Sequence, residues 1–362
     1  MKKTINIYNT IVYMVLFSQK SVAFTLATFC IIAIASYFSG FIQKKMSPNN
    51  DEVIRKYLLN DSPLYGHNRP KLWIHTTYEY NARKWQSFGS RSSTDLNQPY
   101  LHLTIRSIIH HCGNSFHICL IDDDSFNQLI PEWNVQVKNM PDPQKSHYRS
   151  LAMAQLLYIY GGIVVPNSFI CMKDLAPFYE TCMASNKPFV CEMPNIYPNL
   201  NSANKVQKFT SSPCFMGARK QDKIMKNYAA YIMQLNEQTP YSSETEFFGY
   251  HSKWLNVQVY DDKIDLLDGL QIGIKDKSGK AILLENLMEE EPLELCPERT
   301  YGVYIPRDEV LKRVKYQWFA VMNSEQLLET DMIVTKYLLY SLSKENNDML
   351  IRKSVQKSVT SI

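Results

Sequence analysis

The stretch from Tyr148 to Val165 constrains the fold most, because a helical pattern, a double glycine and an apolar run follow one another. Apolar residues recur at helical spacing up to Tyr160, Gly161 and Gly162 interrupt the pattern, and the run Ile163 to Val165 follows. A glycine can adopt a positive φ angle, which ends a helix and lets the backbone approach a neighbour or a ligand closely. This order predicts a helix that leads directly into a buried strand, as in α/β proteins.

A strand, a helix and a second strand are predicted before this unit. The run Lys71 to Thr76 is of strand type, a helical pattern extends from Asp95 to Gly113, and the run Phe116 to Ile121 leads into Asp122, Asp123 and Asp124. Such alternation predicts a mostly parallel sheet flanked by helices, with ligands bound beyond the carboxyl ends of the strands. His75 and the three aspartates are therefore candidate ligand-binding residues. Further strands are expected near 188–191 and 214–218, and further helices over 220–235, 243–254 and 324–342.

A segment without charged side chains, residues 21–43, precedes the predicted α/β domain. About 20 helical residues cross the ~30 Å hydrocarbon layer of a bilayer, so this length predicts a transmembrane helix, with Lys20 and Lys44 at the headgroups. A cleaved signal peptide is the alternative, because Ala33 and Ala35 are small enough for cleavage.

These patterns divide the chain into five parts. They are an N-terminal tail (1–20), the transmembrane helix (21–43), a stalk (44–69), an α/β domain with a helical C-terminal elaboration (70–342) and a polar tail (343–362). We expect a single-pass protein in contact with membrane lipid. An endomembrane of the ER or Golgi type is the expected location, with a viral or other membrane as the alternative.

The composition limits the class of partner. With 45% hydrophobic and 20% charged residues the chain can build an ordinary globular core. The net charge of +4 comes from 39 basic and 35 acidic residues that form no basic stripe, so nucleic acid is not an expected partner. The cysteines lack paired metal-ligand spacing, which argues against a zinc site.

The segment Tyr148 to Ser168, with its Leu-Tyr-Ile-Tyr-Gly-Gly-Ile, resembles the core of glycosyltransferases with a DXD sugar-binding region, which include capsular polysaccharide synthesis proteins and initiating mannosyltransferases. The strand Pro70 to His75 is similar to the opening strand of that family, and the resemblance covers roughly residues 70 to 220. It implies a GT-A-like fold, a nucleotide-sugar donor, a glycan acceptor and a Mn²⁺ or Mg²⁺ ion. It also implies that Gly161 and Gly162 border the donor site.

The sequence departs from the family at the positions that carry the chemistry. Counting from the double glycine places Pro166, Asn167 and Ser168 in the DXD slot, so both metal-binding carboxylates are missing. In the preceding helix, Ser150 and Met153 stand where the family has aspartate and arginine. In this family the aspartates hold the metal ion that stabilises the departing nucleotide.

Two features could restore catalysis. The aspartate triplet, and Asp122 and Asp124 in particular, could hold the metal, although Asp124 or Ser125 could instead cap a short helix over 126–130 while the others are solvated. Alternatively, Arg149 or Lys145 could neutralise the diphosphate without a metal.

Other candidates also have two readings. His75 could line the donor pocket or pack beside Trp73. Glu244 or Glu246 could lie near an acceptor or belong to a capped helix start.

The sequence thus supports two functions. The first is sugar transfer from a nucleotide sugar by a membrane-anchored protein with an altered donor site. The second is a catalytically inactive glycosyltransferase-like protein that acts as a membrane-tethered binding or structural component.

Overall fold

A computed structural model describes residues 69–76, 98–194 and 209–343. The predicted N-terminal tail and transmembrane helix lie outside these ranges, as do all but the last residue of the stalk and all but the first of the C-terminal tail. Within the described ranges, no helix has both the length and the apolar character needed to span a membrane.

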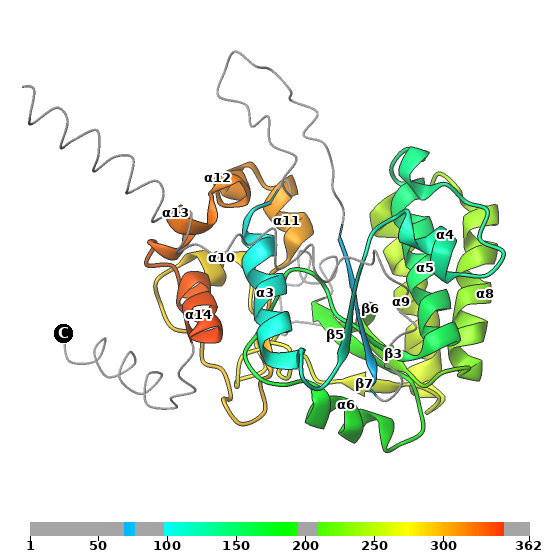
Figure 1. The fold of residues 1–362 in the computed structure, drawn as a ribbon, viewed down its shortest axis with the longest axis horizontal. Helices are drawn as coiled ribbons and strands as arrows, with labels where there is room; N and C mark the ends of the chain where they lie inside the picture. The colour runs from blue at the N-terminus through cyan, green and yellow to red at the C-terminus, as the bar shows by residue number, and fades with distance from the viewer. Residues whose placement is uncertain (1–68, 77–97, 195–208, 344–362) are drawn as a thin grey trace, which may run out of the picture. The chain divides into compact units, whose positions relative to one another are not determined.

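A mixed six-stranded sheet with the strand order β2-β1-β3-β6-β5-β7 forms the centre of the described domain (Figure 1). The pairs β1–β2, β1–β3 and β5–β7 are parallel, whereas β6 runs antiparallel to β3 and β5. A separate antiparallel pair joins β4 to β8. The strands are β1 (Lys71–His75), β2 (His117–Ile121), β3 (Gly162–Val164), β4 (Phe169–Cys171), β5 (Phe189–Pro194), β6 (Phe209–Ala218), β7 (Asp265–Leu267) and β8 (Gly302–Tyr304).

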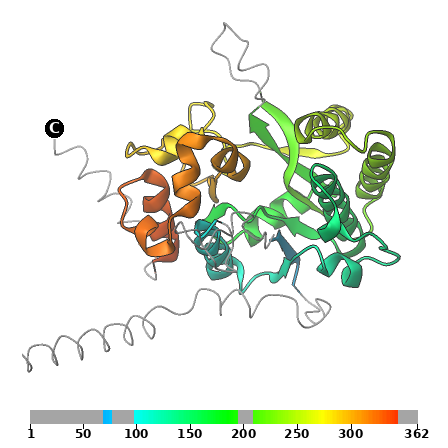
Figure 2. The same ribbon diagram turned by 90° about the horizontal axis from the view of Figure 1, so that it is seen from above.

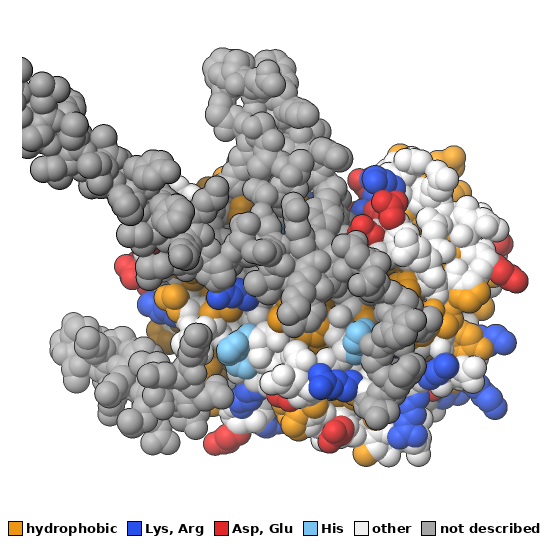
Figure 3. Space-filling model, viewed as in Figure 1, with side chains coloured by type: hydrophobic (Ala, Val, Ile, Leu, Met, Phe, Trp, Pro, Cys, Tyr) orange, Lys and Arg blue, Asp and Glu red, His pale blue; other side chains and the backbone are white. Residues whose placement is uncertain are grey.

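Helices cover both faces of this sheet. In Figure 2 the helices α5, α8 and α9 lie on one side, and α3 and the C-terminal helices lie on the other. Positive, negative and hydrophobic side chains are interspersed on the face seen in Figure 3. The helices are α3 (Tyr100–Cys112), α4 (Ser125–Leu129), α5 (Gln144–Tyr160), α6 (Ala176–Met183), α8 (Lys223–Gln238), α9 (Glu244–Tyr260), α10 (Leu284–Met288), α11 (Arg307–Lys312), α12 (Gln317–Val321), α13 (Ser324–Leu328) and α14 (Ile333–Leu342), with short 3₁₀ turns at Val137–Asn139 and Val314–Tyr316.

Strand β1 contributes to both hydrophobic cores. Leu72 and Ile74 pack into the core that contains α3 and the C-terminal helices, whereas Trp73 packs into the core that contains α5, α8 and α9. Successive side chains of a strand point to opposite faces, so a strand covered on both faces must be apolar throughout. This requirement explains the uninterrupted Leu-Trp-Ile run.

The predicted strand–helix–strand–helix–strand order is confirmed from β1 to β3. Helix α3 ends at Cys112 before Gly113, and α5 ends at Tyr160 before Gly161, as the glycines indicated. Helix α5 begins a turn earlier than expected, directly after Pro143.

The single C-terminal helix predicted over 324–342 is wrong. Two helices, α13 and α14, occupy this range and are separated at Glu329–Met332. The hydroxyl oxygens of Thr330 and Thr335 lie 2.7 Å apart and 2.9 and 3.0 Å from the Leu327 carbonyl oxygen, so one hydroxyl donates to this carbonyl and the other to its neighbour or to the carbonyl. Side-chain hydroxyls that bond to the backbone in this way compete with helix continuation.

The double glycine serves close backbone packing. Gly161 has a φ of 72°, and a Cβ there would lie 2.6 Å from the Lys220 amide nitrogen. Gly162 has a φ of 104°, and its Cβ would lie 2.2 Å from the Lys71 carbonyl oxygen. Only glycine allows β3 to begin this close to β1.

We therefore expect Gly162→Ala to lower the free energy of unfolding by about 3 kcal/mol or more, measured by urea denaturation, because strain and a backbone clash combine. Gly249→Ala in α9 is the matched control, since its Cβ would meet nothing within 4 Å. It should stabilise the protein by up to about 1 kcal/mol through helix propensity. Equal effects of the two substitutions would contradict the packing role.

Candidate functional site

The ends of the parallel strands β1, β2 and β3 lie together at the carboxyl edge of the sheet. His75 ends β1 and pairs with Ile121 at the end of β2, which places it beside Asp122 and Asp123. On its other side, Asn167 follows β3 and donates its Nδ2–H to the His75 carbonyl oxygen at 3.1 Å. The structure therefore brings together the strand-end residues that the sequence singled out.

Asp123 is the centre of this edge. Arg149 from α5 donates two hydrogen bonds to its carboxylate, from Nε at 2.8 Å and from an Nη at 2.7 Å. The Nε2 atom of His75 lies 3.0 Å from the Asp123 Oδ1 atom. The side chains of Asp123, His75 and Arg149 are only 12%, 16% and 17% exposed, and the His75 ring stacks on Phe126. Asp123 thereby joins β1, the loop after β2 and α5.

The contacts of Asp123 determine the charges at this edge. Burial by itself raises the pKa of Asp123, but the hydrogen bonds from Arg149 and His75 outweigh it and lower that pKa below its ordinary value. Burial lowers the pKa of His75, and the Asp123 carboxylate offsets this only in part. Near neutral pH an ionised Asp123 therefore accepts a hydrogen bond from the Nε2–H of a neutral His75.

Asp122 and Asp124 have other partners. The Asp122 carboxylate accepts hydrogen bonds from the backbone N–H and the hydroxyl of Ser125, at 2.9 and 2.6 Å, at the start of α4. Asp124 makes no side-chain cap and pairs with Lys138 on the surface at 3.1 Å. The aspartate that bonds at the start of α4 is therefore Asp122 and not Asp124, and Asp123 is buried rather than solvated.

The DXD slot is filled by side chains that bond inside the protein. Ser168 is 1% exposed and donates its hydroxyl to the Ile305 carbonyl oxygen at 2.7 Å. Asn167 is 6% exposed, and its own carbonyl oxygen accepts the Thr104 hydroxyl at 2.5 Å. Pro166 begins this turn, and its carbonyl oxygen accepts the Phe169 N–H. These contacts fix the turn after β3 against β1, α3 and β8.

The predicted donor-site glycines lie elsewhere. Because β3 runs parallel to β1, Gly161 and Gly162 lie beside Lys71 at the amino ends of the strands, opposite the edge that carries His75. Gly161 and Gly162 therefore do not border the edge that carries His75 and the aspartates. The hydroxyl of Ser150 donates to the Ser146 carbonyl oxygen within α5, and Met153 is buried in the core.

The described residues do not fit a divalent cation held by carboxylates. Mg²⁺ and Mn²⁺ need several oxygen ligands, yet Asp123 is occupied by Arg149 and His75, and Asp122 by Ser125. Across residues 69–76, 98–194 and 209–343, no three His, Cys, Asp or Glu side chains converge as a metal site would require.

Arg307, at the start of α11, is a site residue that the sequence analysis missed. Its charge makes a minor contribution to the pKa values of both His75 and Tyr100, and Ile305, two residues before it, accepts the Ser168 hydroxyl at the turn after β3. Burial raises the pKa of Tyr100, whose hydroxyl donates to Gln98 at 2.9 Å. No sequence signal marks Arg307, because α11 lies more than 180 residues beyond β2 and only the packing of the C-terminal helices brings it near.

The two candidate acceptor residues have structural contacts. Glu246 forms a capping box with Ser243, each accepting a hydrogen bond from the other's backbone N–H. Glu244 pairs with Lys312 at 2.9 Å. The capped-helix interpretation accounts for Glu246.

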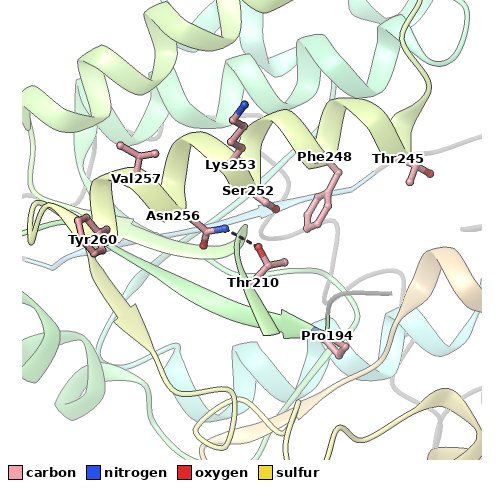
Figure 4. A pocket seen from close by; sticks show the side chains of 10 residues that line it. Pro194, Thr210, Thr245, Phe248, Ser252, Lys253, Asn256, Val257 and Tyr260 are labelled. Atoms are coloured by element: carbon pink, nitrogen blue, oxygen red, sulfur yellow. Dashed lines mark hydrogen bonds between the residues drawn. The ribbon is translucent and has the colours of Figure 1, made fainter. Parts of the chain in front are cut away.

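A groove of about 630 Å³ lies between α9 and the ends of β5 and β6 (Figure 4). Phe248 projects into it, and Asn256 bridges its floor by donating to the Thr210 hydroxyl at 3.0 Å. Since β6 pairs with β3 only from Met216 onward, Thr210 lies beyond the carboxyl end of β3. The groove is lined by Pro194, Thr210, Thr245, Phe248, Gly249, Ser252, Lys253, Asn256, Val257 and Tyr260.

No protein-family model and no curated protein matches the sequence. Among solved structures, the chain is similar to apo mouse xyloside xylosyltransferase 1, with a TM-score of 0.33 and 11% identity over 56% of this chain and 85% of that one. It is also similar to the Streptococcus pneumoniae glycosyltransferase GlyE, with TM-scores of 0.35 and, for the apo form, 0.36, and 10% identity. Those matches cover 80% of this chain and 64% of GlyE. At these scores the likeness carries no argument about activity.

Arg149→Met should lower the free energy of unfolding by about 3 kcal/mol, because it leaves the Asp123 carboxylate buried without its guanidinium partner. Lys138→Met removes the same charge from the exposed pair with Asp124, whose side chains are 66% and 62% exposed, and should cost less than about 1 kcal/mol. Urea denaturation of both variants measures the difference. A small effect of Arg149→Met would contradict the structural role of the pair.

The contribution of Asp123 should depend on pH. Because its folded pKa is lowered, its stabilisation is complete above the unfolded pKa of about 3.9 and is lost as the pH falls toward the folded pKa. The difference in unfolding free energy between the wild type and Asp123→Asn should therefore be largest near neutral pH and shrink below about pH 4. Denaturation curves from pH 7 to pH 3 measure it, with Asp124→Asn as the control at the exposed pair. A difference that stays constant with pH would contradict the assignment.

Proposed function

We propose that the chain transfers sugar from a nucleotide sugar at the carboxyl edge of β1, β2 and β3, with a donor site that does not use a carboxylate-held metal ion. One observation carries the proposal. The ends of β1, β2 and β3, whose sequences resemble the glycosyltransferase family, lie together at His75. At this edge, however, Arg149 neutralises the charge of Asp123, and the side chains of Asn167 and Ser168 in the DXD slot form hydrogen bonds inside the protein.

Basic side chains take the place of the metal in this proposal. A departing nucleoside diphosphate needs positive charge close by, which a guanidinium can supply through paired N–H donors. The charges of Arg149 and Arg307 both act on His75, and Arg307 is the proposed contact to the diphosphate because Arg149 already binds Asp123. His75 stays neutral and holds its orientation through Asp123, so it serves as a polar wall of the donor site.

The glycan acceptor would bind in the groove beside α9. Sugars bind to flat apolar rings combined with hydroxyl and amide groups, and the groove offers Phe248 and Tyr260 with Thr210 and Asn256. The groove lies beyond the carboxyl end of β3, and His75 is at the carboxyl end of β1, so both are at the same edge of the sheet.

Loss of catalysis is the second candidate function. It is favoured by the internal hydrogen bonds of Asn167 and Ser168 and by the pairing of Asp123, because these contacts leave none of the three as a ligand for metal or sugar. The chain would then be a binding or structural component. Its attachment to a membrane depends on residues 21–43 and stays a prediction.

Titration calorimetry of the purified full chain with UDP-, GDP- and CMP-sugars tests donor binding. Each titration is run with Mn²⁺ and again with a chelator. The proposal predicts binding of one nucleotide class with the same affinity in both conditions. Arg307→Met should weaken it by roughly 10- to 100-fold, because a charge-assisted hydrogen bond to phosphate is lost. Lys138→Met is the control for non-specific charge effects and should leave the affinity unchanged.

Binding that requires Mn²⁺ would overturn the metal-independent donor site. Release of nucleoside diphosphate in the presence of oligosaccharide acceptors then separates the two candidate functions. Turnover supports transfer, whereas binding without turnover supports the inactive component.

A further inference from the structure

Two cysteines on neighbouring strands lie almost in bonding position. The Sγ atoms of Cys191 on β5 and Cys214 on β6 are 3.3 Å apart. A disulfide bond requires about 2.05 Å between the sulfurs, so a small rotation of the side chains would close the gap.

An irregularity of β6 creates this contact. Val190 pairs with Met216, but the next residue, Cys191, pairs with Ser212, so three residues of β6 bulge out between these positions. Pro213 lies in the bulge, where a residue without a backbone N–H is tolerated. The Cys214 N–H bonds to the Ser212 hydroxyl at 3.2 Å, which holds the bulge in shape. The bulge carries Cys214 over Cys191.

The two sulfurs differ in their surroundings. Cys191 is fully buried, whereas Cys214 is half-buried. The Cys191 thiol can donate to the Ser212 carbonyl oxygen at 3.6 Å, and burial raises its pKa, whereas the contact with Cys191 lowers the pKa of Cys214. A thiolate is the species that attacks disulfides, so Cys214 is suited to react first and Cys191 second.

We propose that Cys191 and Cys214 form a redox-active pair that closes to a disulfide across the β5–β6 bulge. The oxidant is a small-molecule or protein disulfide, for which glutathione disulfide is the probe. The proposal is independent of sugar transfer, because neither cysteine belongs to the donor site described above.

The reaction balances in two exchanges. The Cys214 thiolate attacks one sulfur of glutathione disulfide, which forms a mixed disulfide and releases one glutathione thiolate. Cys191 then loses its proton to solvent and attacks the Cys214 sulfur, which forms the Cys191–Cys214 bond and releases the second glutathione. Two protein thiols are oxidised, and one glutathione disulfide is reduced to two thiols.

A second pair provides an internal comparison. Cys112 on α3 and Cys171 on β4 have sulfurs 3.7 Å apart, but both residues are fully buried. Without an accessible sulfur, this pair should oxidise more slowly in the folded protein. Cys182 and Cys296 are half-buried, and no sulfur partner is seen for either among the described residues.

The test equilibrates the full chain in mixtures of reduced and oxidised glutathione, alkylates the remaining thiols and maps the peptides by mass spectrometry. We expect a cross-linked peptide that joins Cys191 to Cys214, with the loss of two hydrogen atoms, before any link between Cys112 and Cys171 appears. In Cys191→Ser, Cys214 should stop at the mixed disulfide with glutathione. Cys182→Ser is the matched control and should keep the cross-link.

Thermal unfolding gives a second readout. Oxidation should raise the Tm of the wild type by roughly 5 °C, because the bond restricts the unfolded chain, and should leave the Tm of Cys191→Ser unchanged. The proposal is overturned if the folded wild type gives no Cys191–Cys214 peptide in any mixture. It is also overturned if Cys112 and Cys171 link at least as fast, or if the cross-link appears only after unfolding in urea.

Discussion

The Asp123 carboxylate is the contact on which the carboxyl edge depends. It accepts two hydrogen bonds from Arg149 and lies within hydrogen-bonding distance of His75, so one side chain joins β1, the loop after β2 and α5. A buried carboxylate is costly unless charge and hydrogen bonds compensate it, and here both are present. The contacts that hold β1, the loop after β2 and α5 together also neutralise the carboxylate that could otherwise bind a metal ion. A substitution of Asp123 should therefore change both the packing of this edge and its charge.

The turn after β3 is held in place by hydrogen bonds inside the protein. In the resembling family, carboxylates in this slot would face the donor, whereas here Asn167 bonds to the His75 carbonyl oxygen and Ser168 to that of Ile305. Both contacts attach the turn to backbone carbonyl groups of other segments. Ser168 also connects the sheet region to the segment that leads to α11 and Arg307.

The β5–β6 hairpin has a different role from the donor edge. Its bulge brings two cysteines together, and its ends border the groove beside α9. A covalent bond at the bulge would restrain the strand that carries Thr210 without touching His75 or Asp123. The redox state of the hairpin and the chemistry of the carboxyl edge can therefore be studied separately.

The sequence by itself determined the strand and helix order from Lys71 to Val165, because apolar periodicity and helix-ending glycines are local signals. It also singled out His75 and the aspartate triplet, since polar residues that follow buried strands collect at one edge of a parallel sheet, and Arg149 as a basic residue that could neutralise a diphosphate. Only the tertiary structure decided which aspartate is buried and paired, where the double glycine lies and that Arg307 approaches the edge. These depend on strand register and on packing between segments far apart in the chain, which no local pattern encodes.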